Sequence, residues 1–361
     1  MALDNPIRAV RRGEELDAQR LKKFLVKNAL IGSTTSELVT HQFSNGYSNL
    51  TYLLQIEERE YVLRRPPFNA PKRGHDMGRE FRVLKHLNPV FEKTPKVFVY
   101  SENEMIIGAP FYLMEKVDGE ILSAKAAFKR QVSPEEFKTI SNTWLDTFVA
   151  FHEIDYKAVG LHDLGKPDGY VHRQVINWGK QYLAAATDDV PEAEKVMRWM
   201  EAKQPKHYDH CLIHNDFKYD NVVFSRDDWK DIAAILDWEM CTLGDPLMDL
   251  GTSLGYWTTH SDAEFMKQGL PSPTVMKGNP SRSEIVQQYA LKSGRSIDNL
   301  VFYYAYGLFK IAVIAQQIYY RYKHGYTNDP KFANLNHAAA LCCRTAWMAI
   351  QKNEIDNLNL N

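Results

Sequence analysis

The sequence contains only four cysteines in 361 residues, and their positions do not follow the spacing of a metal site. Cys342 and Cys343 are adjacent and could form a disulfide only with strain. This composition excludes a disulfide-stapled scaffold and favours a reduced, cytoplasmic protein. The N-terminus carries charges from Asp4 onward and lacks the apolar core of a signal peptide. We therefore expect a cytoplasmic location.

The chain also lacks a large net charge and a long uninterrupted apolar run. Its formal net charge is −1, so no overall field favours nucleic acid or an anionic membrane. Its most apolar segment, residues 300–318, is interrupted by Lys310 and is expected to be a buried helix that does not span a membrane. Apolar residues make up 44% of the chain and aromatic residues 12%, as in globular proteins. We expect no nucleic-acid or membrane partner.

The most informative segment is H-N-D-F-K-Y-D-N, which runs from His214 to Asn221 and is followed by Asp237 in a D-W-E phrase. In phosphoryl transfer, one carboxylate orients the attacking hydroxyl, while a carboxamide and a second carboxylate hold Mg²⁺ against the nucleotide phosphates. Protein kinases write these groups as H-R-D-x-x-x-x-N and D-F-G. Here Asn215 replaces the Arg. The pattern predicts Asp216 as the catalytic carboxylate.

The runs around these residues predict a hairpin. Residues 222–224 and 232–236 are short apolar segments separated by a polar turn. Such a hairpin would bring Asn221, before its first strand, close to Asp237, after its second strand. Two oxygen ligands placed in this way can share a hard cation. The alternative is a set of ordinary polar loop residues, but both spacings together favour a nucleotide-dependent site with Asn221 and Asp237 as Mg²⁺ ligands.

The same motifs carry a family resemblance. The H-x-D-x-x-x-x-N phrase, L-D-W-E at 236–239 and G-D-P-x-x-D-L at 244–250 resemble the aminoglycoside phosphotransferase and choline kinase superfamily. The phrases at 46–52 and 61–67 are similar to the branch that includes the kinase-like domains of acyl-CoA dehydrogenase polypeptides. The resemblance runs from about residue 43 to residue 326. Its motifs are specific for the fold and less specific for the substrate.

The resemblance implies an α+β, bilobal, protein-kinase-like fold. We expect an N-terminal five-stranded antiparallel sheet with a helix, and a larger, mainly helical C-terminal lobe. The expected domains are 1–115, the nucleotide-binding lobe, and 116–361, the catalytic and acceptor-binding lobe. Periodicity predicts strands and helices whose ranges are 15–28, 37–43, 50–57, 61–65, 75–87, 97–100, 111–114, 283–293, 299–323 and 330–352. Residues 258–279 are richer in polar residues, Gly and Pro, which suggests a mobile loop over the pocket.

The turn between the first two expected strands contains Gly46, Ser48 and Asn49. Gly46 permits a positive φ, and the two polar residues add hydrogen-bond donors. A strand-turn-strand with this tip can lie over phosphates and donate backbone N–H groups. The tip is not G-x-G-x-x-G, so an ordinary hairpin turn remains the alternative. We predict these three residues as part of the nucleotide site.

The next strand places Arg64 where protein kinases have a Lys that pairs with nucleotide phosphates and with a Glu of the following helix. A guanidinium can bridge phosphate and carboxylate as a fork. Glu80, within the helix expected at 75–87, is the candidate partner, and a solvated Glu80 is the alternative. The resemblance further implies that the linker between lobes reads adenine through the Glu115 carbonyl and the Val117 amide.

Further residues are expected to support the site or the acceptor. His214 is expected to brace the catalytic loop, and Asp249, in a turn that leads into a helix, to support it by hydrogen bonding. Arg173, Gln174 and Trp178 lie in a polar-aromatic stretch that resembles phrases in the branch named above. We predict that they form a wall of the acceptor pocket. The alternative is packing against the catalytic loop.

These assignments predict a kinase that uses ATP and Mg²⁺ to move the γ-phosphoryl group to a hydroxyl of a small molecule. The first alternative is a nucleotide-binding pseudokinase scaffold, which Arg64 in place of Lys favours and the presence of Asp216, Asn221 and Asp237 opposes. The second is a protein kinase, which the absence of an A-P-E phrase after Asp237 opposes. The acceptor is open between an aminoglycoside-like compound and a hydroxyacyl thioester or other metabolite with an anionic group.

Overall fold

The computed structural model describes residues 7–43, 49–67, 75–226, 229–327 and 329–358. Spatial contacts divide the chain into two compact units. The N-terminal unit comprises residues 1–119 and 233–241, and the C-terminal unit comprises residues 120–232 and 242–361. The division after Gly119 lies close to the expected one at 115, but the segment 233–241 joins the N-terminal unit. The roles that we predicted for the two lobes stay predictions.

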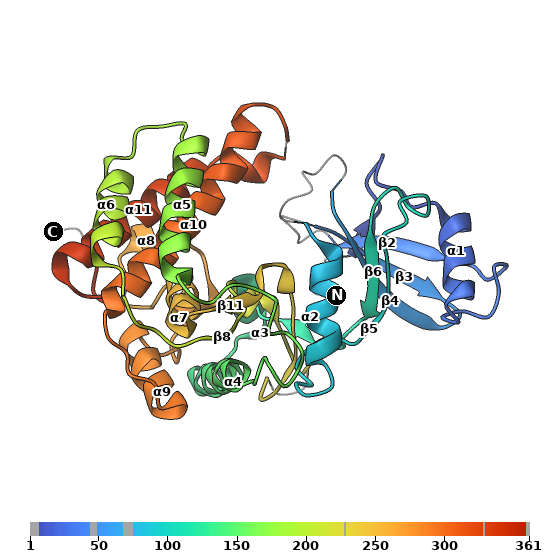
Figure 1. The fold of residues 1–361 in the computed structure, drawn as a ribbon, viewed down its shortest axis with the longest axis horizontal. Helices are drawn as coiled ribbons and strands as arrows, with labels where there is room; N and C mark the ends of the chain where they lie inside the picture. Colours follow the sequence, from blue (N-terminus) through green and yellow to red (C-terminus); the bar gives the residue numbers. More distant parts are fainter. Residues whose placement is uncertain (1–6, 44–48, 68–74, 227–228, 328, 359–361) are drawn as a thin grey trace. The chain divides into compact units, whose positions relative to one another are not determined.

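In its described residues, the N-terminal unit combines one sheet with two helices (Figure 1). Its elements are β1 (Ile7–Ala9), α1 (Ala18–Lys27), β2 (Val39–Phe43), β3 (Leu50–Ile56), β4 (Arg59–Arg65), α2 (Met77–Leu87), β5 (Val97–Ser101), β6 (Phe111–Glu115) and the 3₁₀ turn η2 (Trp238–Met240). Among the residues that the structure describes, the sheet has six strands in the order β1-β2-β3-β4-β6-β5, and every neighbouring pair is antiparallel.

The expected α+β, kinase-like fold class is confirmed, with one strand more than the five expected. The additional strand, β1, pairs with β2 so that Ile7 lies opposite Phe43. It covers only three residues, I-R-A, and its sequence is too short to show the alternation that marked the other strands. Pairing with the edge of the sheet, a tertiary interaction, therefore defines this strand.

Alternation along β4 assigns its side chains to the two faces of the sheet. Tyr61 and Leu63 join the apolar core that contains Leu21 and Leu25 of α1. Arg64 therefore belongs to the opposite face, and α2 packs against β5 and β6 of the same sheet. Each large apolar side chain buried in the α1 core contributes about 1.5–3 kcal/mol of transfer free energy. The register that buries Leu63 is thus the register that turns Arg64 toward α2.

The C-terminal unit is mainly helical (Figure 1). Its helices are α3 (Ala124–Arg130), α4 (Pro134–His152), α5 (Tyr170–Ala185), α6 (Pro191–Lys203), α7 (Pro246–Gly255), α8 (Glu264–Gly269), α9 (Arg282–Ser293), α10 (Leu300–Lys323) and α11 (Leu335–Lys352). Its short strands are β7 (Glu120–Ile121), β8 (Cys211–Ile213), β9 (Val222–Phe224) and β11 (Thr242–Gly244), and its 3₁₀ turns are η1 (Tyr219–Asn221), η3 (Pro273–Val275) and η4 (Pro330–Phe332). Strand β10 (Ile232–Ile235) begins in this unit and continues into the N-terminal unit.

Helix α10 forms the centre of this unit and packs against α5, α6, α7 and α11. It crosses α7 at close range because both helices carry glycine at the crossing. A Cβ atom added to Gly251 would lie 2.2 Å from the Tyr303 carbonyl oxygen, and one added to Gly307 would lie 2.0 Å from the Gly251 carbonyl oxygen. Larger residues would force the helices apart. The crossing fixes how α10 approaches the loop that precedes β9.

The segment 258–279, expected as a loop, contains helix α8 and turn η3 and forms hydrogen bonds of its own. The Thr258 hydroxyl donates to the Leu270 carbonyl oxygen at 3.1 Å, and the Thr274 hydroxyl donates to the Thr258 carbonyl oxygen at 2.7 Å. The expected helix at 330–352 is divided into η4 and α11. Both differences come from side-chain and turn contacts that periodicity alone does not predict.

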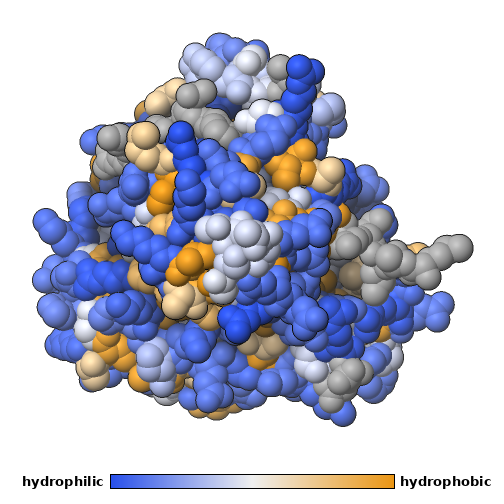
Figure 2. Space-filling view, turned by 90° about the vertical axis from the view of Figure 1, so that its right-hand side faces the viewer, coloured by the Kyte–Doolittle hydropathy of each residue, from blue (hydrophilic) through white to orange (hydrophobic). Residues whose placement is uncertain are grey.

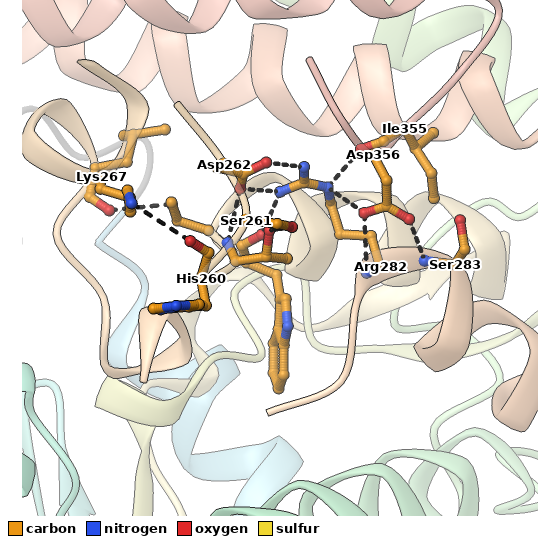
Figure 3. Close-up of polar contacts among 12 residues, drawn as sticks. His260, Ser261, Asp262, Lys267, Arg282, Ser283, Ile355 and Asp356 are labelled. Atoms are coloured by element: carbon orange, nitrogen blue, oxygen red, sulfur yellow. Dashed lines mark hydrogen bonds and ion pairs between the residues drawn. The ribbon is translucent and has the colours of Figure 1, made fainter. Parts of the chain in front are cut away.

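A buried arginine that follows the segment 258–279 holds the start of that segment (Figure 3). Arg282 is 1% exposed. Its Nη1 donates to the Trp257 carbonyl oxygen and to Asp262 Oδ2, each at 2.7 Å, and its Nη2 donates to Asp262 Oδ1 at 2.6 Å. Its Nε donates to the Ile355 carbonyl oxygen at 2.5 Å, and its backbone N–H donates to Asp356. One side chain thus ties the segment to the C-terminal end of the chain.

Within the described ranges, no helix is long and apolar enough to cross a membrane. Figure 2 shows one face of the molecule, on which hydrophilic residues dominate and hydrophobic residues form small separate groups. Isolated apolar residues on a surface are normal and do not by themselves mark an interface.

Candidate active site

Arg64 is the centre of an ionic cluster in the N-terminal unit. Its Nη2 lies 2.8 Å from Asp237 Oδ1, 3.4 Å from Glu80 Oε1 and 3.9 Å from Glu239 Oε2. The structure therefore pairs Arg64 with Glu80, the partner chosen from the sequence. It adds Asp237 and Glu239, because residues 233–241 fold onto this unit. A guanidinium with several donors can hold two or more carboxylates in fixed positions.

Three carboxylates lie within ion-pair distance of the Arg64 guanidinium. Burial raises the pKa of Glu80, the most deeply buried of the three. Burial opposes the charge of Arg64, but Glu80 above all, with Asp237 and Glu239, raises the pKa of Arg64 well above its usual value. The side chain of Asp237 remains 32% exposed, whereas that of Glu80 is 1% exposed. Asp237 is thus the carboxylate best placed to gain a further cationic partner from solvent.

Asn49 connects this cluster with the end of the β2–β3 turn. Its side-chain Nδ2 donates to Glu239 Oε2 at 2.6 Å, and its Oδ1 lies 2.9 Å from His75 Nδ1. Both ends of the amide are therefore used within the protein. Gly46 and Ser48, the other predicted residues of this turn, lie outside the described residues. The predicted contact of the turn with phosphates stays a prediction.

The two residues predicted to bind adenine lie at the end of β6 and just after it. Glu115 ends β6, and its backbone N–H donates to the Lys96 carbonyl oxygen at 2.8 Å. Its side-chain Oε1 accepts from the Lys96 N–H at 2.7 Å, so Glu115 is held at both positions. Val117 lies in the irregular segment before β7. Nucleotide reading by these two residues stays a prediction.

Asp216 lies in the loop between β8 and β9 of the C-terminal unit, where it meets two donors. Asn221 Nδ2 donates to Asp216 Oδ2 at 2.7 Å and to the Asp216 carbonyl oxygen at 2.9 Å. Lys218 Nζ lies 3.1 Å from Oδ1 and 3.0 Å from Oδ2 of Asp216. Because Asn221 uses its Nδ2 in this way, its Oδ1 is the atom that it can offer to a cation. Sequence and geometry thus agree on the atom, while the ligand role stays a prediction.

Lys218 was not selected from the sequence, although it lies two residues after Asp216. Its Nζ is 4.2 Å from the centre of the Tyr256 ring. Burial opposes its charge, but Asp216 and Tyr256 raise the pKa of Lys218 above its usual value. Lys218 therefore stays charged and keeps a cation beside the candidate base. Lys218 could have been selected from the sequence because it lies within the polar motif 214–221.

The backbone of this loop is held by Asp249 of α7. The His214 N–H donates to Asp249 Oδ2 at 2.6 Å, and the Asn215 N–H donates to Oδ1 at 2.7 Å. His152, at the end of α4, lies 3.2 Å from the same carboxylate and 2.7 Å from the Tyr289 hydroxyl. Burial favours the neutral form of Asp249, but His152 and the loop N–H groups lower its pKa. A charged, buried Asp249 thus fixes the loop.

The ring of His214 takes part in the same support. It is buried, and its Nδ1 accepts the Asp216 backbone N–H at 3.3 Å. This contact fixes the backbone of Asp216 and uses a nitrogen that a reacting histidine would need. His214 thus has the contacts of a bracing residue.

The three predicted acceptor-pocket residues lie on α5. The guanidinium of Arg173 donates to the carbonyl oxygens of Lys166 and Asp168, in the turn before the helix. Trp178 Nε1 donates to Gln174 Oε1 at 3.0 Å. These contacts are internal to the C-terminal unit, and an acceptor role for the three residues stays a prediction.

No group of three or more His, Cys, Asp or Glu side chains among the described residues is arranged to hold a metal ion. Mg²⁺ often binds in a different way, through one or two protein oxygens with waters and substrate phosphates. The exposed carboxylate of Asp237 and the Oδ1 of Asn221 fit that donor set. Asp237 belongs to the N-terminal unit and Asn221 to the C-terminal unit, so their convergence stays a prediction of the sequence.

The model of one family, described as the phosphotransferase enzyme family, matches residues 39–271. This match covers more than half of the chain. The chain belongs to this family. The residues that it matches include β2 to β6, the Asp216 loop, Asp237 and α7.

Curated relatives extend the similarity toward larger proteins. Acyl-CoA dehydrogenase family member 10 of Mus musculus is 33% identical over 343 residues, which are 94% of this chain and 32% of that protein. Acyl-CoA dehydrogenase family member 11 of Gallus gallus is 33% identical over 335 residues, which are 90% of this chain and 42% of that protein. The chain thus spans less than half of either relative. This confirms the resemblance to the branch with kinase-like domains in acyl-CoA dehydrogenase polypeptides.

Solved structures show the same phosphotransferase fold. A Ralstonia eutropha JMP134 protein assigned as an aminoglycoside phosphotransferase has a TM-score of 0.77 and 28% identity, covering 94% of this chain and 99% of that one. Choline kinase from Cryptosporidium parvum has a TM-score of 0.60 and 11% identity, covering 95% and 99%. A mutant of the aminoglycoside phosphotransferase APH(4)-Ia, in complex with ADP and hygromycin B, has a TM-score of 0.56 and 15% identity, covering 91% and 97%.

Proposed function

We propose that this member of the phosphotransferase family is a cytoplasmic, ATP- and Mg²⁺-dependent small-molecule kinase that transfers the γ-phosphoryl group to a hydroxyl. The observation that carries the proposal is the arrangement around Asp216. Its carboxylate is fixed by Asn221 and faces Lys218 at about hydrogen-bond distance. A positioned base beside a fixed cation is what transfer to a hydroxyl requires, because this chemistry depends mainly on positioning and electrostatics.

In this proposal each half of the site has its own task. Asp216 accepts the hydrogen bond, and finally the proton, of the acceptor hydroxyl. Lys218 lies beside it and offsets negative charge that develops on the transferred group. Arg64, held by Glu80, positions the nucleotide phosphates. The contacts of Arg64 with Glu80 and of Lys218 with Asp216 support these roles.

Asn221 and Asp237 would hold Mg²⁺, through the Asn221 Oδ1 and the Asp237 carboxylate. Such an ion, when bound, supplies positive charge that stabilises the phosphate oxygens. The partial exposure of the Asp237 carboxylate, which is 32% exposed beside Arg64, supports a divalent cation at this place. The ADP-bound relative supports the choice of an adenine nucleotide as the donor.

The charges beside Asp216 support one class of acceptor. An acceptor with several amino groups needs carboxylates that are free to pair with them, as a polycation site does. Here Lys218 neutralises Asp216, and Asp249 is fully buried against His152 and two backbone N–H groups. We therefore favour a hydroxyacyl thioester, or another hydroxyl compound with an anionic group, over an aminoglycoside. The acyl-CoA dehydrogenase names of the relatives agree with an acyl thioester.

The pseudokinase scaffold is the less favoured alternative. Its support was Arg64 in place of the usual Lys, but Arg64 has the carboxylate partner that the Lys of a kinase has. An APH-family relative has been solved with a nucleotide and an acceptor compound together. The alternative predicts nucleotide binding without transfer to any hydroxyl.

Replacing Asp237 with Ala is expected to abolish the Mg²⁺-dependent part of nucleotide affinity. The carboxylate is the exposed anionic group of the Arg64 cluster, and losing it removes a hard oxygen ligand. Calorimetric titration with ATP, with and without Mg²⁺, measures this change. Exposed Glu92 of the same unit provides the matched control, because Glu92→Ala should keep the full Mg²⁺ effect. Equal Mg²⁺ effects in Asp237→Ala and the wild type would remove Asp237 from the metal site.

A panel of hydroxyl compounds, scored by ADP release above a blank with water as the acceptor, tests the acceptor. The panel contains neutral alcohols, aminoglycosides and hydroxyacyl thioesters. We expect the largest increase with an anionic hydroxyl compound, since Lys218 already pairs with Asp216 and weakens the attraction of this carboxylate for amino groups. A response to aminoglycosides alone would contradict the proposed acceptor class.

A further inference from the structure

Lys310 is a buried cation in the middle of the apolar helix α10. Its exposed fraction is 1%. Its Nζ donates to the Asn215 carbonyl oxygen at 2.6 Å and to Asn215 Oδ1 at 3.0 Å, and it lies 5.9 Å from the centre of the Trp178 ring. A charged group inside an apolar helix is costly unless its hydrogen bonds repay the desolvation. Both hydrogen bonds of the Lys310 ammonium go to Asn215, so the reason for burying this cation is sought at Asn215.

Asn215 is the residue immediately before the candidate base Asp216, and its backbone is strained. Its φ is +69°, in the left-handed region that a residue with a side chain rarely adopts. It is held there from three sides. Asp249 of α7 accepts its N–H at 2.7 Å, the Tyr170 hydroxyl of α5 lies 3.3 Å from its Nδ2, and Lys310 of α10 takes its carbonyl oxygen.

The carbonyl contact is the one that bears on Asp216. The Asn215 carbonyl belongs to the peptide group whose N–H belongs to Asp216 and donates to His214 Nδ1. Because a peptide group is planar, holding its oxygen fixes the plane from which the Asp216 side chain projects. Asp249 and Tyr170 hold the other atoms of Asn215. Lys310 alone among these three holds this peptide plane.

We propose that Lys310 is a positioning residue of the kinase, which holds the Asn215–Asp216 peptide so that the Asp216 carboxylate points at the acceptor hydroxyl. The effect of Lys310 on catalysis rests on the proposed function. The tether between α10 and the loop before β9 does not depend on that function. Displacement of a reacting group by about 1 Å can cost about 10²-fold in rate, so a tether of this kind has a measurable effect.

The charged and titratable groups around Lys310 come from three elements. Asp249 lies on α7, and Asp216 and Lys218 lie in the loop before η1. The Tyr170 hydroxyl of α5 forms a hydrogen bond with the Asn215 side chain, which Lys310 also contacts. Burial lowers the pKa of Lys310 to about 8, a shift that Asp249 and Asp216 oppose and Lys218 increases. Since a lowered pKa means loss of the proton as pH rises, the charged tether weakens above about pH 8.

The test compares Lys310→Met with Lys310→Arg, and with Lys323→Met as the matched control. Met keeps the length of the side chain without a donor, and Arg keeps the charge at every accessible pH. Lys323 lies on the same helix but is 41% exposed, and it donates to the Thr187 carbonyl oxygen. The control therefore removes an ammonium group from α10 without touching the loop.

The first readout is hydrogen exchange of peptides that cover residues 211–221, which needs no enzymatic activity. Lys310→Met should speed exchange in this loop by about 10- to 100-fold, the scale of a hydrogen bond to a charged group. Lys323→Met should leave the loop unchanged, and Lys310→Arg should restore part of the protection. Unchanged exchange in Lys310→Met would overturn the tether, whether or not the chain is a kinase.

The second readout is turnover with the best acceptor from the hydroxyl panel. Lys310→Met should lower kcat by about 10- to 100-fold, while the affinity for Mg²⁺-ATP stays at the wild-type value. The wild type should lose turnover as pH rises through about 8, and Lys310→Arg should not. If Lys310→Met had the kcat of the wild type, with each rate divided by the concentration of protein that binds nucleotide, the positioning role would be overturned. Absence of transfer in every protein, including the wild type, would contradict the proposed function and leave the exchange result to decide the tether.

Discussion

Replacing Asp216 with Asn is expected to lower kcat by about 10²- to 10⁴-fold, the usual contribution of a positioned general base. The substitution keeps the size of the side chain and one oxygen that can accept from Lys218 or Asn221. It removes the carboxylate that accepts the hydroxyl proton. Affinity for Mg²⁺-ATP should change little, because the phosphate-binding group Arg64 is untouched. Steady-state turnover and a nucleotide titration separate the two effects.

Asp209 provides the control for this experiment. It is an exposed carboxylate of the same unit, shortly before β8, and pairs with Arg295 at 3.6 Å. Asp209→Asn should retain nearly all of the activity, because surface ion pairs contribute about 1 kcal/mol or less. Asp216→Asn with wild-type turnover on the same acceptor would show that this carboxylate is not the base.

Replacing Asp262 with Ala is expected to lower the free energy of unfolding of the C-terminal unit by about 3–5 kcal/mol, the cost of leaving one partner of a buried ion pair alone. Arg282 would stay buried with its two carbonyl acceptors, and with Asp356 at 3.4 Å from its Nε. These remaining contacts favour the lower end of that range. The loss should appear as faster hydrogen exchange in peptides covering 257–283 and as a lower urea midpoint.

Two further variants serve as comparisons for Asp262→Ala. Glu194→Ala breaks an exposed pair with Arg198 on α6 and should change the midpoint little. The double variant Asp262→Leu with Arg282→Met should recover part of the lost stability, because a buried pair can be replaced by apolar groups at low cost. If Asp262→Ala were as stable as Glu194→Ala, the ion pair of Arg282 would not stabilise the segment 258–279. The segment would then be held by its own hydrogen bonds alone.

Much of the N-terminal unit could be predicted from the sequence because its strands are short apolar runs bounded by polar turns. The match to the kinase strand placed Arg64 where a Lys pairs with a Glu of the next helix, and the structure pairs Arg64 with Glu80. Strand β1 could not be predicted, since three residues give too short a pattern. Asp237 and Glu239 beside Arg64 could be placed only by the fold, which returns residues 233–241 to the N-terminal unit.

The polar network of the C-terminal unit was predicted only in part. The motif 214–221 singled out Asp216 and Asn221, and the G-D-P phrase singled out Asp249, because each lies in a short recognisable pattern. Lys310 and His152 lie in helices that read as ordinary core elements, and their partners are far away in the sequence. For Lys310 the one available signal was a charge within an apolar run, and its partner Asn215 became evident only from the packing of α10.

We propose that this chain moves a phosphoryl group onto a hydroxyl with Asp216 as the base. The decisive experiment incubates wild type and Asp216→Asn with ATP, Mg²⁺ and the best hydroxyl compound of the panel, and detects a new phosphomonoester by ³¹P NMR. We expect this phosphomonoester in equal amount to ADP for the wild type, with a rate at least about 10²-fold lower for Asp216→Asn. Tight Mg²⁺-ATP binding with no phosphomonoester from any hydroxyl compound would contradict it and favour the scaffold.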